Sequence, residues 1–156
     1  MKEKHIPYFE LVCAFEFEEC PICFLIRDKV EKFYNDLLYE NVNDIGFRQE
    51  FKENFGFCVY HSYKLASYND SLAVALCYEN LLNDVVKKLK NKEKRLFKEK
   101  RVCKVCELIK ELEARYISLM FEYLNDSEFK EKFSKSKGLC VKNLQMFIEK
   151  NNEIPN

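Results

Sequence analysis

An internal duplication constrains the fold of this chain more than any other feature of its sequence. When residues 30–61 are aligned with residues 112–143, eleven of the 32 positions are identical, whereas unrelated segments would share about two. The identities include an Asn-Asp pair, two phenylalanines, a glycine and a cysteine, in the same order in both copies. We therefore expect the chain to fold as two related halves, each with the same local architecture.

Each half contains the same motifs in the same order. A CxxC pair opens the half, and the two pairs are Cys20/Cys23 and Cys103/Cys106. A long periodic segment follows, then the motif NDxxF[RK]xxF, and then GxCxx, which is followed by His61 in one half and Asn143 in the other. Two of the three glycines stand in this last motif. Glycine there suits a helix end or a turn with positive φ, just before a new helix begins.

Hydrophobic periodicity predicts an all-α fold. Apolar residues step by three and four through residues 26–42, 72–89 and 105–124, which is the spacing of amphipathic helices with one buried face. No stretch alternates convincingly like a strand. The dipeptide Asn43-Asp44 and its repeat counterpart Asn125-Asp126 are typical of sites where one helix ends and the next is capped.

Length and composition favour one domain. The chain has 156 residues, of which 47% are apolar, so it can build a sizeable core. We expect a single all-α domain over residues 1–156, a helical bundle made of two related halves. The halves lie at about residues 10–65 and 94–150, and a helix and a basic linker at residues 66–93 join them.

Cysteine usage points to metal or redox chemistry. The N-terminal segment has no basic stretch followed by an apolar one, so we expect a cytoplasmic chain whose eight cysteines stay reduced. No apolar run approaches the length of a membrane span, and we expect no membrane partner. Metal binding or redox chemistry then explains the CxxC pairs better than a disulfide framework does. Cys13 and Cys77 lie outside the motifs among apolar neighbours, and we expect both to be buried.

The motifs of the first half supply a set of metal ligands. Cys20 and Cys23 are close enough in sequence to share one ion, and Pro21 suits the first turn of the helix that follows. Cys58 and His61 are three residues apart and project from one face of a helix. Together the four ligands form a Cys3His set, a common coordination of structural zinc. We therefore expect zinc at Cys20, Cys23, Cys58 and His61.

The second half retains three cysteines of the pattern, namely Cys103, Cys106 and Cys140. Asn143 stands where the first half has His61, and an amide side chain is a poor zinc ligand. Four interpretations are open: a decayed and empty site, which we favour, a position filled by water or substrate, His5 as the fourth ligand, or an iron–sulfur cluster. Pairing across the halves, with the CxxC of one and the GxC of the other, is also compatible with the sequence.

A basic segment lies between the halves. Residues 87–104 contain ten basic and two acidic residues, a net charge of +8 in a chain whose total is zero. The candidate contact residues are Lys87, Lys88, Lys90, Lys92, Lys94, Arg95, Lys98, Lys100 and Arg101. Such a segment could meet phosphates or an acidic partner. Its only aromatic residue is Phe97, which gives little basis for base stacking, so a solvated linker is favoured over nucleic-acid binding.

No catalytic motif accompanies the cysteines. The chain lacks a P-loop, GxGxxG, HExxH and GxSxG, so an enzymatic activity is not favoured. We expect a metal-binding helical protein with structural zinc and an interaction or regulatory role toward an unknown macromolecular partner. The alternative is a redox or iron–sulfur electron-transfer protein that uses the CxxC cysteines. Nucleic-acid binding through the basic segment is a further alternative.

The motifs also resemble those of an uncharacterised prokaryotic family of small proteins with duplicated CPxC and GxCxxH motifs, seen often in anaerobes. The resemblance rests on Cys20-Pro21-Ile22-Cys23, on LLYENVND at residues 37–44 with Phe47-Arg48 after it, and on GFCVYH at residues 56–61. It covers residues 10–61 well and the second half more loosely. It implies Cys/His motifs of the metal-binding type and no established activity. Asn143 departs from the family pattern, in which a histidine is expected.

Overall fold

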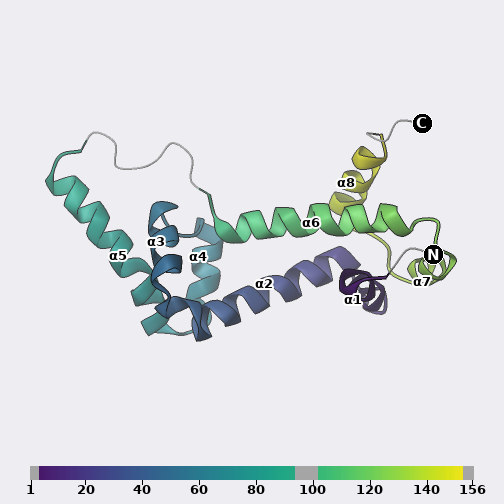
Figure 1. Ribbon diagram of the computed structural model, residues 1–156, viewed down its shortest axis with the longest axis horizontal. Helices are drawn as coiled ribbons and strands as arrows, with labels where there is room; N and C mark the ends of the chain where they lie inside the picture. Colours follow the sequence, from purple (N-terminus) through teal and green to yellow (C-terminus); the bar gives the residue numbers. More distant parts are fainter. Residues whose placement is uncertain (1–3, 94–101, 153–156) are drawn as a thin grey trace. The chain divides into compact units, whose positions relative to one another are not determined.

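The computed structural model describes residues 4–93 and 102–152, and within these residues the chain is helical without any strand (Figure 1). This confirms the all-α prediction. The helices are α1 (Ile6–Ala14), α2 (Pro21–Tyr39), the 3-10 turn η1 (Asn41–Asn43), α3 (Ile45–Glu53), α4 (Val59–Ala66), α5 (Ser71–Lys90), α6 (Lys104–Tyr123), α7 (Ser127–Ser134) and α8 (Val141–Asn152). Within the same residues, no helix is both long and apolar enough to cross a membrane.

Aspartate caps begin the short helices that follow the long ones. The Asp44 carboxylate accepts a hydrogen bond from the Phe47 backbone N–H at 2.6 Å, and Asp126 accepts one from Phe129 at 2.9 Å. Each cap satisfies a backbone N–H that has no partner inside the helix. The predicted helix boundaries at the two Asn-Asp pairs are thereby confirmed.

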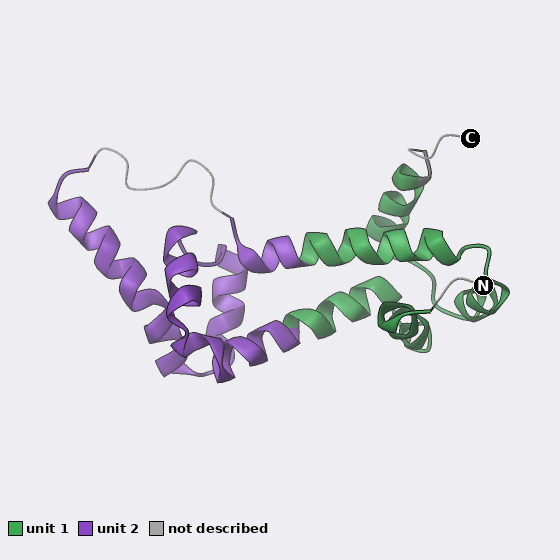
Figure 2. Cartoon of the chain, viewed as in Figure 1, with its two compact units in different colours: residues 1–30, 109–156 green, residues 31–108 purple. Residues whose placement is uncertain are grey.

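The chain divides into two compact units that do not follow the repeat halves (Figure 2). Unit 1 comprises residues 1–30 and 109–156, and unit 2 comprises residues 31–108. The boundaries fall inside α2 and α6, so each of these two helices contributes to both units. Every unit therefore combines a CxxC segment from one half with the NDxxF and GxCxx segments of the other. The single domain expected over residues 1–156 stays a prediction.

In unit 1 the core is built where α1 packs against α7. The ring of Phe15 lies 5.2 Å from that of Phe129 and 5.3 Å from that of Phe133, centroid to centroid. Tyr8 lies 6.0 Å from Phe129 and is almost fully buried. Aromatic pairs at these separations add to the free energy gained by burying their area.

In unit 2 the equivalent core is built where α5 packs against α3. The Phe51 ring lies 5.1 Å from Tyr78 on α5 and 5.0 Å from Phe57. Phe51 and Phe133 occupy the same position of the repeat. The helix before each CxxC motif thus packs against a short helix of the other half: α1 packs against α7, and α5 packs against α3. This packing brings CxxC and GxCxx segments from different halves together.

Candidate metal centre

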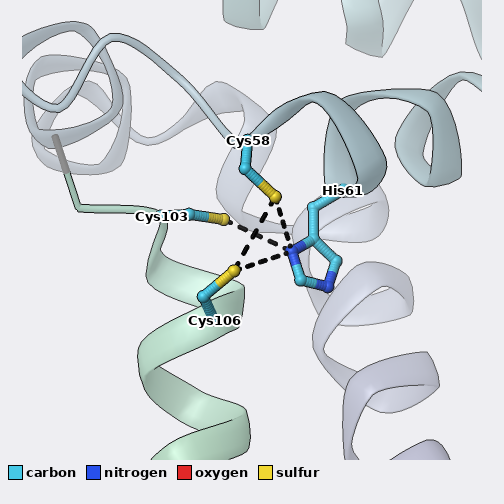
Figure 3. A group of neighbouring side chains, drawn as sticks. All are labelled: Cys58, His61, Cys103 and Cys106. Carbon is cyan, nitrogen blue, oxygen red and sulfur yellow. Dashed lines mark hydrogen bonds between the residues drawn. The ribbon is translucent and has the colours of Figure 1, made fainter.

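Unit 2 contains a cluster of three thiols around one imidazole (Figure 3). The Nδ1 atom of His61 lies 3.2 Å from the sulfur of Cys58, 3.4 Å from that of Cys103 and 3.3 Å from that of Cys106. The sulfurs of Cys58 and Cys106 are 3.7 Å apart. All four ligand atoms lie within 4.8 Å of one another, which places them in range of a single metal ion.

Two helix starts supply these four side chains. Cys58 is the residue before α4 and Cys103 the residue before α6, and their carbonyls accept the first hydrogen bonds of those helices, at 2.8 and 3.0 Å. His61 and Cys106 follow three residues later in the first turn. This spacing puts both members of a pair on one side of the helix start. The positive end of the helix dipole also favours thiolate there.

Gly56 allows the chain to turn between α3 and Cys58. Its φ is +74°, and its backbone N–H donates to the Phe51 carbonyl at 2.8 Å, which closes the end of α3. Gly138 has a φ of +72° at the same place in the second half. The expected positive φ at this glycine is confirmed in both copies, since only glycine adopts it without strain.

Charge in the unit 2 cluster is unevenly shared. Burial opposes ionisation of Cys58, but the backbone N–H of His61 and contacts with Cys106 and Cys103 outweigh it and hold the pKa of Cys58 below its ordinary value. Burial and the neighbouring thiols raise the pKa of Cys106 to about 12. Burial also lowers the pKa of His61, so the imidazole is neutral at pH 7, the form that binds metals. Thiolates this close together repel one another, and a central cation would offset that repulsion because it attracts each of them.

Unit 1 contains a second cluster, in which Cys20 and Cys23 lie with Cys140. The sulfurs of Cys23 and Cys140 are 3.6 Å apart. The Asn143 amide nitrogen donates to Cys20 and Cys23, each at 3.4 Å. The architecture is the same, because Cys20 precedes α2 and Cys140 precedes α8, with carbonyls that accept the first helical hydrogen bonds at 3.0 and 2.9 Å.

The thiols of unit 1 show the same division of charge. Burial opposes ionisation of Cys20, but the backbone N–H groups of Cys140 and Cys23 and the Asn143 amide hold its pKa below the ordinary value. Burial, a contact with Cys140 and the charge of Cys20 raise the pKa of Cys23 to about 12. In each cluster one thiol is the first to ionise, and its charge then disfavours the next ionisation unless a cation is present.

The spacing of both clusters fits one tetrahedral ion. Zinc lies about 2.3 Å from thiolate sulfur and about 2.0 Å from histidine nitrogen, so a regular tetrahedron has edges of about 3.8 Å between sulfurs and about 3.5 Å between sulfur and nitrogen. The sulfur pairs at 3.6 and 3.7 Å match the first edge, and the imidazole contacts at 3.2 to 3.4 Å are close to the second. A disulfide needs about 2.05 Å, and all eight cysteines are free thiols.

Comparison with known proteins places this architecture in a family. The model of DUF6062, described as a family of unknown function, matches residues 1–101 and again residues 88–156. The chain belongs to DUF6062. The two matches agree with the duplication seen in the sequence, and they confirm the resemblance to an uncharacterised family.

One curated relative of this DUF6062 chain is the "Uncharacterized 23.9 kDa protein in xynA 3'region" of Caldicellulosiruptor sp. (strain Rt8B.4). It is 30% identical over 142 residues, which is 87% of this chain and 68% of the relative. No solved structure matches the chain.

The ligand grouping expected within the first half of the DUF6062 chain is wrong. Cys20 and Cys23 do not join Cys58 and His61 in one cluster, because each CxxC pair lies beside the GxC motif of the other half. Pairing across the halves, the alternative that the sequence left open, is the arrangement found. His5 is in neither cluster of the described residues. The binding of metal by the seven Cys and His residues of the clusters stays a prediction.

The two cysteines outside the motifs of the DUF6062 chain differ in burial, and one residue near the site was not predicted. Cys77 is buried as expected, and burial raises its pKa to about 11, but Cys13 is exposed, which corrects the expectation for that residue. Tyr34, which contacts the site through the backbone of His61, was not singled out from the sequence. Its identity with Tyr116 in the repeat is the signal that could have identified it.

The basic segment of the DUF6062 chain is only partly described. Lys87, Lys88 and Lys90 lie in the last turn of α5, where cations interact favourably with the helix dipole, and Lys92 follows two residues after α5 ends. The remaining candidate contact residues lie outside the described residues, and they are Lys94, Arg95, Lys98, Lys100 and Arg101. A basic contact surface therefore stays a prediction.

Proposed function

We propose that this DUF6062 chain is a zinc-binding protein in which Cys58, His61, Cys103 and Cys106 form a closed structural site. The observation that carries the proposal is the position of His61 Nδ1, which lies 3.2 to 3.4 Å from three sulfurs. Three thiolates and one imidazole satisfy the four-coordinate preference of zinc and leave no open position. The ion would supply cross-linking between the starts of α4 and α6.

Such a site contributes to folding. A structural zinc of this kind stabilises a small domain by about 10 kcal/mol at neutral pH, because the unfolded chain has no preformed site. Two ligands come from the GxCxxH motif and two from a CxxC motif whose Cys106 is 45 positions from His61. The bound ion therefore holds together segments that are distant along the chain.

Spacing favours a single ion over an iron–sulfur cluster. A polynuclear cluster puts several iron ions and sulfides between the thiolates and so separates the cysteine sulfurs more widely than one ion does. Sulfurs at 3.7 Å suit one shared ion.

A closed site also has no position for a substrate, so we assign an interaction or regulatory role rather than an enzymatic one. Thiolate ligands require reducing conditions, and this supports a cytoplasmic location.

Metal analysis of single-cysteine variants tests the proposal. We expect Cys106→Ser to lose one equivalent of zinc and to lower the free energy of unfolding by several kcal/mol. Cys13→Ser is the matched control, because Cys13 is exposed and outside both clusters, and it should keep the zinc and the stability of the parent. Iron in place of zinc would support the redox alternative. Protein purified under reducing conditions without any bound metal would overturn the proposal.

A further inference from the structure

Asn143 occupies in unit 1 the place that His61 occupies in unit 2. The residue is only 1% exposed, and its Nδ2 atom lies 3.4 Å from the sulfurs of Cys20 and Cys23. Its Oδ1 atom is buried and has no hydrogen-bond partner among the described residues. Burying an amide oxygen without a hydrogen-bond partner is unfavourable, so this side chain is incompletely satisfied as it stands.

The end of the Asn143 side chain lies near the fourth corner of a tetrahedron. A ligand atom at that corner is about 3.5 Å from each sulfur, and the Asn143 contacts at 3.4 Å agree with this edge. A half-turn of the amide about its last side-chain bond exchanges the nitrogen and oxygen positions. The oxygen that lacks a partner then faces the sulfurs of Cys20 and Cys23, where it can serve as a ligand.

We propose that Cys20, Cys23, Cys140 and Asn143 bind a second metal ion, with the Asn143 amide oxygen as a weak fourth ligand. Three thiolates select a soft or borderline cation of the zinc class. A neutral amide oxygen donates less strongly to such a cation than imidazole does, so this ion exchanges more readily than the ion of the Cys3His site. The inference concerns the unit 1 cluster and is separate from the structural zinc of unit 2.

Metal stoichiometry and release from the full-length protein test the inference. We expect two zinc ions per chain after loading with zinc alone, one released quickly to a chelator and one slowly. Cys23→Ser should remove the fast phase and Cys106→Ser the slow phase. The two outcomes identify each phase with one unit, and Cys13→Ser should leave both unchanged.

Exchange of the fourth ligand between the sites gives the sharpest comparison. Asn143→His should slow the fast phase by about tenfold or more, and His61→Asn should accelerate the slow phase by a similar factor. Even residues that only hydrogen-bond to metal ligands alter metal affinity about 10- to 100-fold when they are mutated. Asn143→Leu removes the donor at similar size and should reduce occupancy of the unit 1 cluster, whereas Asn143→Asp should restore it. Far-UV circular dichroism confirms that each variant is folded.

Three results would overturn the inference. A single zinc that Cys106→Ser removes and Cys23→Ser retains leaves the structural site intact and shows the unit 1 cluster to be empty. If two zinc ions bind but neither release rate changes in Asn143→His, then Asn143 is not a ligand. Unchanged occupancy in a folded Asn143→Leu variant does the same.

Discussion

The hydroxyl of Tyr34 donates a hydrogen bond of 2.9 Å to the backbone carbonyl of His61. Tyr34 is fully buried on α2, so the contact connects the interior of unit 2 to the helix that carries the imidazole. Its repeat counterpart Tyr116 is also buried, but its hydroxyl donates to the Glu10 carboxylate at 3.0 Å. The tyrosine at this repeat position thus donates a hydrogen bond to a candidate metal ligand in unit 2 and to an acidic side chain in unit 1.

Removal of the Tyr34 hydroxyl should loosen the unit 2 site. We expect Tyr34→Phe to lower the free energy of unfolding by about 1 kcal/mol, since the hydrogen bond is lost while the ring remains. Zinc release from the Cys3His site should become faster at unchanged stoichiometry. Tyr116→Phe is the matched control and should destabilise the protein without changing that release. Equal effects of the two variants on release would show that Tyr34 acts through global stability alone.

The fall in the free energy of unfolding at acidic pH should depend in part on Glu10. Its carboxylate accepts hydrogen bonds from Lys29 at 2.5 Å and Tyr116 at 3.0 Å. Burial alone would raise the pKa of Glu10, but these hydrogen bonds and the charges of Lys29 and Arg115 outweigh it and lower the pKa. The unfolded chain therefore binds the proton more readily, and the contribution to stability is complete above the ordinary pKa of about 4.3 and is lost as pH falls through the lower folded value.

Urea unfolding at several pH values checks this sign. We expect Glu10→Gln to be less stable than the parent at pH 7, with a difference that shrinks below about pH 4. Acid also protonates the thiolates, but that loss affects both proteins and leaves their difference intact. Glu16→Gln, at an exposed position, should show little difference at any pH. A gap between Glu10→Gln and the parent that widens in acid contradicts the assignment.

The two motif glycines should respond differently to the same substitution. Both have positive φ, so alanine costs about 1 kcal/mol of backbone strain at either position. A Cβ on Gly56 would lie 3.0 Å from the ring of buried Phe51, whereas a Cβ on Gly138 meets nothing within 4 Å. We expect Gly56→Ala to lose an additional 1 to 3 kcal/mol, about the usual cost of overpacking. Equal losses in denaturant unfolding would show that Phe51 can move aside.

Cleavage between the halves should leave the chain assembled. We expect a protease site inserted between residues 94 and 101 to give two fragments that stay together and keep their metal, because each unit takes helices from both sides of the cut. Each fragment alone carries only part of either cluster. Size-exclusion chromatography with metal analysis, before and after chelation, measures both properties. Fragments that separate while one of them keeps zinc would mean that ligands pair within a half.

Local features of the site were predictable from the sequence. The helix caps at Asp44 and Asp126 and the turn at Gly56 depend on neighbouring residues, and the structure confirms them. The i, i+3 spacing of Cys58 and His61 likewise brings both onto one helix start. These features need no knowledge of how distant segments pack.

The partners of each motif were not predictable in the same way. Which CxxC joins which GxC depends on the packing of Phe15 against Phe129 and of Tyr78 against Phe51, and these contacts join residues far apart in the chain. A repeat makes the problem harder, because each segment suits the equivalent partner in either half. The exposure of Cys13 was missed for a related reason, since its apolar neighbours do not reveal which side of α1 is covered.

The exchange of segments between halves has a consequence for synthesis on the ribosome. Cys23 precedes its partner Cys140 by 117 positions, and at about 5 to 20 residues per second of translation the interval is roughly 6 to 23 s. During that interval Cys20 and Cys23 lack Cys140, the third cysteine of their cluster. The cluster around His61 is completed once Cys106 has emerged, so the two clusters form in a defined order as the nascent chain grows.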